Sequence, residues 1–219
     1  MIFLKTKFNV KYLKHQYTYK TLLIVFATCL FYGCKQTPQV TIESISGKYL
    51  ESIKKDQIIM EDGSVYDIPL TDSSYVYYLV RHAEKDTIPK NDPRLTQEGY
   101  DRASKLYDLL KGTRIDAIYS TMYMRTIETV NSLADAKGMK IMPYSPQGFK
   151  ELHANLKENT DYKRIIISGH SNTTPVVANY LSDSNHFTAS FDDSDYDNFI
   201  VVVENGQNDK TLIPLRYKP

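Results

Sequence analysis

The sequence has only two cysteines, almost no net charge and no apolar run of membrane-spanning length. These shortages exclude several classes of protein. Two cysteines cannot build the disulfide framework on which small secreted domains depend. A net charge of +1 in 219 residues leaves no strongly basic surface, so nucleic acid is not an expected partner. The remaining composition is that of an ordinary globular protein with one sizeable domain.

Charge is unevenly distributed, because residues 1–33 hold five lysines and no acidic residue. Removing those five positive charges from the net +1 leaves −4 for the rest of the chain. As a helix, the apolar run over residues 21–33 would extend only about 20 Å, short of the roughly 30 Å hydrocarbon layer of a bilayer. We therefore expect residues 1–33 to be a secretory signal peptide and not a membrane span.

Gly33 is followed by Cys34 and the polar stretch Lys35-Gln-Thr-Pro-Gln39, which resembles the lipobox of bacterial lipoproteins. In that class the cysteine thiol is acylated and the cysteine becomes the new N-terminus. The resemblance implies a bacterial cell-envelope protein, anchored to the membrane by lipid on Cys34 and facing outside the cytosol. The alternatives are an uncleaved signal anchor and a cytosolic protein with an apolar N-terminus. Beyond Cys34 the chain has no cysteine, which suits an oxidising compartment.

Residues 34–46 are mostly polar without periodicity, which predicts a tether, and residues 47–219 are the expected folded domain. The turn signal Glu61-Asp-Gly63 separates residues 57–60 from residues 65–68 and predicts a small β-hairpin in front of the main domain.

From Tyr75 onward, apolar strands alternate with amphipathic helices. The pattern predicts strands over residues 75–80, 115–119, 140–142 and 164–168, and a closing hairpin of residues 199–203 and 211–215. Helices are predicted from the N-cap Thr96 to just before Gly112, over residues 124–137 and over residues 174–181. This order predicts an α/β fold in three layers: an open, mostly parallel sheet with helices on both faces.

Chemically distinctive residues follow three of these strands. Arg81-His82 comes directly after the first strand and Gly169-His170 after the fourth, while Arg125 lies in the first turn of a helix that follows a strand. In open α/β sheets ligands bind beyond the carboxyl ends of the strands, so we expect these side chains in one crevice. Two arginines, two histidines and helix N-termini form a pocket suited to a tetrahedral phosphate group.

In order and spacing these motifs resemble the histidine phosphatase superfamily, over about residues 75–215. The resemblance includes Asp92-Pro-Arg-Leu-Thr96-Gln-Glu-Gly99, the segment 118–125 and Gly169-His170-Ser171. Ala83 follows His82 where the acid-phosphatase and phytase branch has glycine, so the chain resembles the other branch, which includes phosphoglycerate mutase.

The resemblance implies a phosphomonoester hydrolase that uses a phosphohistidine intermediate and needs neither metal ion nor cofactor. His82 would be the nucleophile, and the neighbouring arginines favour the neutral imidazole that attack requires. Arg81, Arg125 and His170 would hold the phosphoryl oxygens, helped by backbone N–H groups near Ser171. The expected partner is a small phosphorylated substrate.

The leaving group also needs a proton, which mutase-like members often take from a glutamate beyond the helix that carries the second arginine. Glu151 matches that position and is the predicted general acid. Glu84, two residues from the nucleophile, is the alternative, and a mechanism without a dedicated acid stays open.

The alternative function is a catalytically idle lipoprotein of the same fold, which retains a phosphorylated ligand or docks an envelope partner. The intact set of two arginines and two histidines favours the enzyme. Asp193, Asp195 and Asp197 match part of a calcium-loop spacing, but the apolar strand that follows them argues against a metal site.

Overall fold

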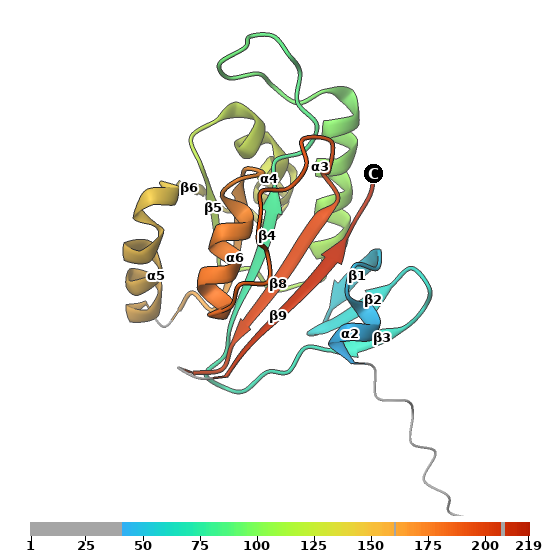
Figure 1. Cartoon of the computed structure of the whole chain (residues 1–219), viewed down its shortest axis with the longest axis vertical. Coiled ribbons are helices and arrows are strands. Elements are labelled where there is room, and N and C mark those ends of the chain that lie inside the picture. The colour runs from blue at the N-terminus through green and yellow to red at the C-terminus, as the bar shows by residue number, and fades with distance from the viewer. Residues whose placement is uncertain (1–40, 160, 207–208) are drawn as a thin grey trace, which may run out of the picture. The chain divides into compact units, whose positions relative to one another are not determined.

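The computed structural model describes residues 41–159, 161–206 and 209–219 (Figure 1). The predicted signal peptide and Cys34 lie outside these ranges. Within them, no helix has the length and apolar character needed to cross a membrane.

A six-stranded sheet with the order β6-β5-β7-β4-β8-β9 forms the centre of the domain. Its strands are β4 (Tyr75–Arg81), β5 (Ala117–Ser120), β6 (Ile141–Pro143), β7 (Arg164–Gly169), β8 (Asn198–Glu204) and β9 (Lys210–Arg216). The first four run parallel, whereas β8 and β9 form an antiparallel hairpin beside β4. The predicted mostly parallel sheet and closing hairpin are confirmed.

Four helices cover the two faces of this sheet (Figure 1). They are α3 (Gln97–Leu110) and α4 (Met124–Lys137) on one face, and α5 (Phe149–Glu158) and α6 (Thr174–Ser182) on the other, with a short 3-10 turn, η1 (Pro146–Gly148), before α5. Tyr78 of β4 joins the apolar core under α3 and α4, and Tyr77 joins the core under α5 and α6. Because both faces are covered, every residue of β4 is buried, which explains its continuous apolar run.

Local signals place the ends of the helices. The Thr96 side chain accepts a hydrogen bond from the backbone N–H of Gly99 and caps α3. Gly138 ends α4 in the left-handed conformation, with φ 63°. Strand β5 begins two residues later than predicted, because the Asp116 carboxylate accepts hydrogen bonds from the backbone N–H groups of Lys163 and Arg164. Residues 115–116 therefore lie in the connection that precedes β5.

A second, three-stranded antiparallel sheet packs into the same core as α3 and α4. The predicted hairpin is present as β2 (Gln57–Met60) and β3 (Val65–Asp67), and β1 (Leu50–Lys54) adds a strand that the sequence did not reveal.

The prediction that the tether extends to residue 46 is wrong. Residues Ile42–Ile45 form the helical turn α2, and Ile45 is fully buried. The reason is apolar spacing: two isoleucines three positions apart lie on one face of a helical turn and can enter the core together. The backbone N–H of Gly47 then donates to the carbonyl oxygen of Pro214, which joins this segment to the C-terminal hairpin.

Candidate active site

An open pocket of about 740 Å³ lies at the carboxyl ends of the parallel strands. Parallel strands bring these ends to one edge of the sheet, so residues that are distant in the sequence meet there. The pocket is lined by five of the predicted site residues: Arg81, His82, Arg125, His170 and Ser171.

His82 is held in the tautomer that an attacking imidazole needs. Its Nδ1 atom lies 2.8 Å from the carbonyl oxygen of Ala83, and a carbonyl only accepts, so Nδ1 carries the hydrogen. The Nε2 atom keeps its lone pair. The residue is only 3% exposed, and this burial, together with the nearby Arg81 and Arg125, lowers the pKa of His82 to about 3, against the opposing effect of the Ala83 carbonyl. His82 is therefore neutral at physiological pH.

His170 is oriented by a chain of hydroxyl groups. Its Nε2 atom lies 2.9 Å from Thr121 Oγ1, which lies 2.9 Å from Thr126 Oγ1. The Thr126 hydroxyl donates to backbone carbonyl oxygens, so the Thr121 hydroxyl donates to Thr126 and accepts from His170 Nε2–H. Burial, and then the charges of Arg125 and Arg81, lower the pKa of His170 to about 4. Its Nδ1 atom is left for a ligand.

Arg81 and Arg125 supply positive charge to the pocket. Arg81 is 2% exposed, and Arg125 is half-buried with its guanidinium carbon 4.4 Å from the centre of the Tyr123 ring. In both side chains the Nε–H group is buried and has no partner among the described residues. Unpaired buried donors are costly, and both of these belong to side chains that line the pocket.

The turn between β7 and α6 leaves little room for a side chain at position 169. A Cβ atom there would lie 3.0 Å from the hydroxyl oxygens of Thr174 and Tyr144. The backbone N–H of His170 donates to Thr173 Oγ1 at 3.0 Å, which fixes the turn that carries Ser171 into the pocket lining. The close approach of β7 to the start of α6 therefore sets the position of the second histidine.

The structure does not bring the predicted acids into the pocket. Glu151 is exposed on α5, because Phe149 and Leu156 turn the opposite side of that helix into the core. Glu84 binds Arg102 through three hydrogen bonds of 2.7 to 2.9 Å, and that arginine is 4% exposed. Neither glutamate lines the pocket, so the geometry does not support the prediction of Glu151 as the general acid or the alternative of Glu84.

Asp193 lines the pocket and was not among the predicted site residues. It belongs to the loop of residues 192–197 between α6 and β8. The Arg81 guanidinium donates to three backbone carbonyl oxygens of this loop, those of Asp192, Asp193 and Asp195. The run of aspartates was visible in the sequence, but its place beside the nucleophile depends on contacts between residues 111 to 114 positions apart.

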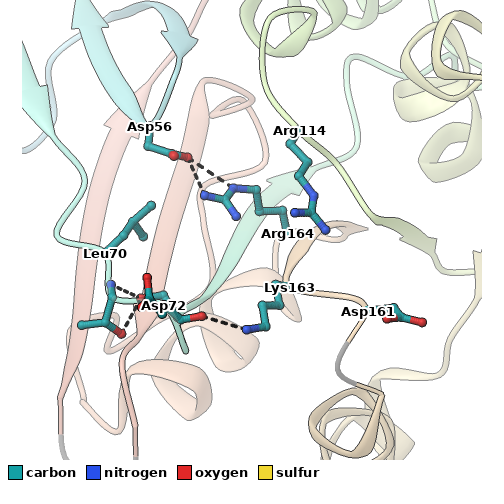
Figure 2. Close-up of a pocket in the computed structure, with 9 residues that line it drawn as sticks. Asp56, Leu70, Asp72, Arg114, Asp161, Lys163 and Arg164 are labelled. Carbon is teal, nitrogen blue, oxygen red and sulfur yellow. Dashed lines mark hydrogen bonds and ion pairs between the residues drawn. The ribbon is translucent and has the colours of Figure 1, made fainter.

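A second pocket, of about 590 Å³, lies at the opposite end of β7, around Arg164 (Figure 2). Its cations already have partners: Arg164 pairs with Asp56 at 2.8 Å, and Lys163 Nζ donates to the Asp72 carbonyl oxygen at 2.9 Å. Its lining contains no histidine or cysteine, so it offers no comparable nucleophile.

Residues 77–181 match the histidine phosphatase superfamily (branch 1). This match covers slightly less than half of the chain and supports the predicted histidine phosphatase superfamily. The matched segment contains both arginines and both histidines of the pocket, and the match supports a hydrolase of the phosphatase type.

Solved structures of phosphatases share the fold. An alpha-ribazole phosphatase from Shigella flexneri is similar with a TM-score of 0.53 and 15% identity, over 64% of this chain and 96% of that one. A mycobacterial glucosyl-3-phosphoglycerate phosphatase is similar with a TM-score of 0.54 and 10% identity, over 66% of this chain and 100% of that one. The predicted fold class is confirmed. No curated protein matches the sequence significantly.

Proposed function

We propose that this protein is a metal-independent phosphomonoester hydrolase that works through a phosphohistidine on His82. The state of His82 supports this most strongly: it is neutral, and its Nε2 lone pair is free beside Arg81 and Arg125. A nucleophilic imidazole needs that lone pair, and a transferring phosphoryl group needs fixed positive charge around its oxygens. The two arginines supply that charge.

In the first step His82 Nε2 attacks the phosphorus atom in line. The P–N bond forms as the P–O bond to the leaving alcohol breaks. The ring gains positive charge, which the Ala83 carbonyl stabilises through Nδ1–H. Arg81 and Arg125 hold the phosphoryl oxygens in the geometry of the transition state.

His170 holds a further phosphoryl oxygen. Its Nε2–H is used by Thr121, so Nδ1 is the atom that faces the substrate. A bound phosphate dianion offsets the arginine charges that lower the pKa of His170, which favours a proton on Nδ1 and a charge-assisted hydrogen bond to the ligand.

In the second step a water oxygen attacks phosphorus and the P–N bond breaks. His82 returns to its neutral form, and inorganic phosphate leaves. The same donors act in both steps, because both transition states spread negative charge over the same phosphoryl oxygens.

Turnover of p-nitrophenyl phosphate by the full-length protein, with EDTA present between pH 5 and pH 8, tests this proposal. We expect turnover in EDTA and a loss of about a thousandfold or more in His82→Ala. His186→Ala is the matched control, because His186 is exposed and does not line the pocket. Vanadate binding without turnover in the wild type would instead support the catalytically idle binding protein.

We also propose that lipid on Cys34 anchors the protein to the bacterial cell envelope, outside the cytosol. The lipobox-like sequence and the basic, apolar segment before it support this. Cells that express the full chain are labelled with an alkyne analogue of palmitate. We expect label on the wild type and on Cys29→Ala, and none on Cys34→Ala. An unlabelled protein in the membrane fraction would favour the uncleaved signal anchor.

A further inference from the structure

The proposed hydrolysis leaves one chemical requirement unassigned. When the P–O bond breaks, the leaving alkoxide needs a proton, and the two glutamates expected to supply it lie outside the pocket. The inference below rests on the proposed function and concerns which residue supplies this proton.

Asp193 is the single carboxylic acid among the described residues that line the pocket. Its side chain is fully exposed, and its Oδ1 atom lies 4.0 Å from Arg81 Nη2. The other functional groups at the site are cationic, neutral or hydroxylic. A carboxyl group here is therefore available both to a substrate and to solvent.

The loop of residues 192–197 is anchored while Asp193 is left free. Asp192 accepts hydrogen bonds from the backbone and hydroxyl of Ser194, and Asp195 pairs with Arg216 at 2.8 Å. Asp197 pairs with Arg102 and Arg216. Within the described ranges the Asp193 carboxylate makes no hydrogen bond, only the long contact to Arg81.

The anchored loop lies directly beside the nucleophile. The Tyr196 ring packs on Arg81, 4.1 Å from its guanidinium carbon, and its centre is 5.9 Å from that of the His82 ring. These contacts, with the three hydrogen bonds from Arg81 to the loop carbonyls, fix the backbone that carries Asp193. The free carboxylate is thus presented from a positioned backbone.

His82 and Asp193 differ in burial in the way that the reaction requires of a nucleophile and a proton donor. His82 is buried, whereas Asp193 is at the solvent-exposed side of the lining. In-line displacement places the leaving oxygen on the side of phosphorus opposite Nε2. A proton donor is needed on that side, away from the buried nucleophile, and Asp193 is the exposed acid of the lining.

We propose that Asp193 is the general acid, and then the general base, of this reaction. In the first step its carboxyl proton passes to the leaving oxygen as the P–O bond breaks and the bond to His82 forms. In the second step the resulting carboxylate takes a proton from water as the water oxygen bonds to phosphorus and the P–N bond breaks. The cycle returns Asp193 to its protonated form.

The test compares two substrates of similar shape in the full-length protein, p-nitrophenyl phosphate and phenyl phosphate. p-Nitrophenolate is a stable anion that departs without a proton, whereas phenolate benefits strongly from protonation. We expect Asp193→Asn to lower kcat/KM for phenyl phosphate by about 100-fold and for p-nitrophenyl phosphate by less than about fivefold. Asp193→Glu is expected to recover part of the loss on phenyl phosphate.

Asp161→Asn is the matched control, because it makes the same charge change at an exposed position outside the loop and outside the lining of this pocket. It is expected to leave both substrates near the wild-type values. An equal loss on the two substrates in Asp193→Asn would overturn the inference, since it would mean that Asp193 acts through Arg81, while the proposed hydrolysis would stand. A wild type that turns over neither substrate would overturn the proposed function and this inference with it.

Discussion

The Nδ1 atom of His82 lies 2.8 Å from the carbonyl oxygen of Ala83, the next residue in the chain. The backbone N–H of Ala83 donates to Thr129 Oγ1 at 2.8 Å, and that hydroxyl donates to the Arg125 carbonyl oxygen at 2.7 Å. The residue whose carbonyl orients the nucleophile is therefore joined through its N–H to the helix that carries the second arginine. Helix α4 therefore helps to position both the His82 imidazole and Arg125.

Removing the Thr129 hydroxyl should break this connection. Thr129→Val keeps the shape but leaves the Ala83 N–H buried and unpaired, so we expect a loss of about 1 to 3 kcal/mol in the free energy of unfolding. Urea denaturation measures this, and kcat should fall as well because the His82 ring loses its support. Thr129→Ser keeps the hydroxyl and is the control; if serine and valine variants lose equal activity, the hydrogen bond is not the cause.

The lowered pKa of His82 predicts how stability depends on pH. The unfolded histidine has a pKa near 6.5 and the folded one about 3, so between these values the unfolded state binds more protons. Stability contributed by neutral His82 is therefore present above pH 6.5 and lost as the pH falls. Relative to His82→Gln, the wild type should lose about 3 kcal/mol between pH 7.5 and pH 4. Urea denaturation at both pH values checks this; a constant difference between the two proteins would contradict it.

Arg125 should contribute directly to phosphate affinity. We expect Arg125→Ala to raise the Kd for inorganic phosphate by about 10- to 100-fold, because a charge-assisted hydrogen bond is lost. Isothermal titration calorimetry measures the constant. Arg114→Ala is the control, since Arg114 is exposed in the pocket at the other end of β7. Similar losses in the two variants would indicate a general charge effect and not a site at Arg125.

Substitution of Glu84 should affect stability, whereas substitution of Glu151 should affect neither stability nor activity. Glu84→Ala removes the main partner of the buried Arg102, so we expect a loss of about 2 to 3 kcal/mol in stability. Glu151→Gln should change neither stability nor kcat/KM for phenyl phosphate, because its side chain is exposed and outside the pocket lining. A large kinetic defect in Glu151→Gln would restore that residue as the proton donor.

The parts of the fold that the sequence predicts are those with local signals. The apolar run of β4, the Thr96 cap and the Gly138 stop each depend on neighbouring residues, and each is found where expected. Strand β1 has no such signal, because its burial alternates irregularly and its pairing with β2 contains a bulge.

The residues of the site also differ in whether a local sequence signal predicts them. His82 and His170 were predicted to share one pocket because strand ends are local features that the parallel sheet brings together. The position of Asp193 depends on backbone carbonyls that Arg81 holds from a distant strand, and no local pattern encodes that contact. The prediction of Glu151 depends on a family resemblance carried by position alone, which does not specify the side of α5 on which a residue lies.

The central claim is that His82 Nε2 becomes phosphorylated during turnover. The full-length protein is mixed with p-nitrophenyl phosphate, quenched in base within milliseconds, digested and sequenced by mass spectrometry. We predict an acid-labile phosphoryl group on the peptide that contains His82, absent when His82→Ala is treated identically. Steady turnover with no phosphate on His82 at any quench time, or phosphate found on His170 instead, would contradict the account.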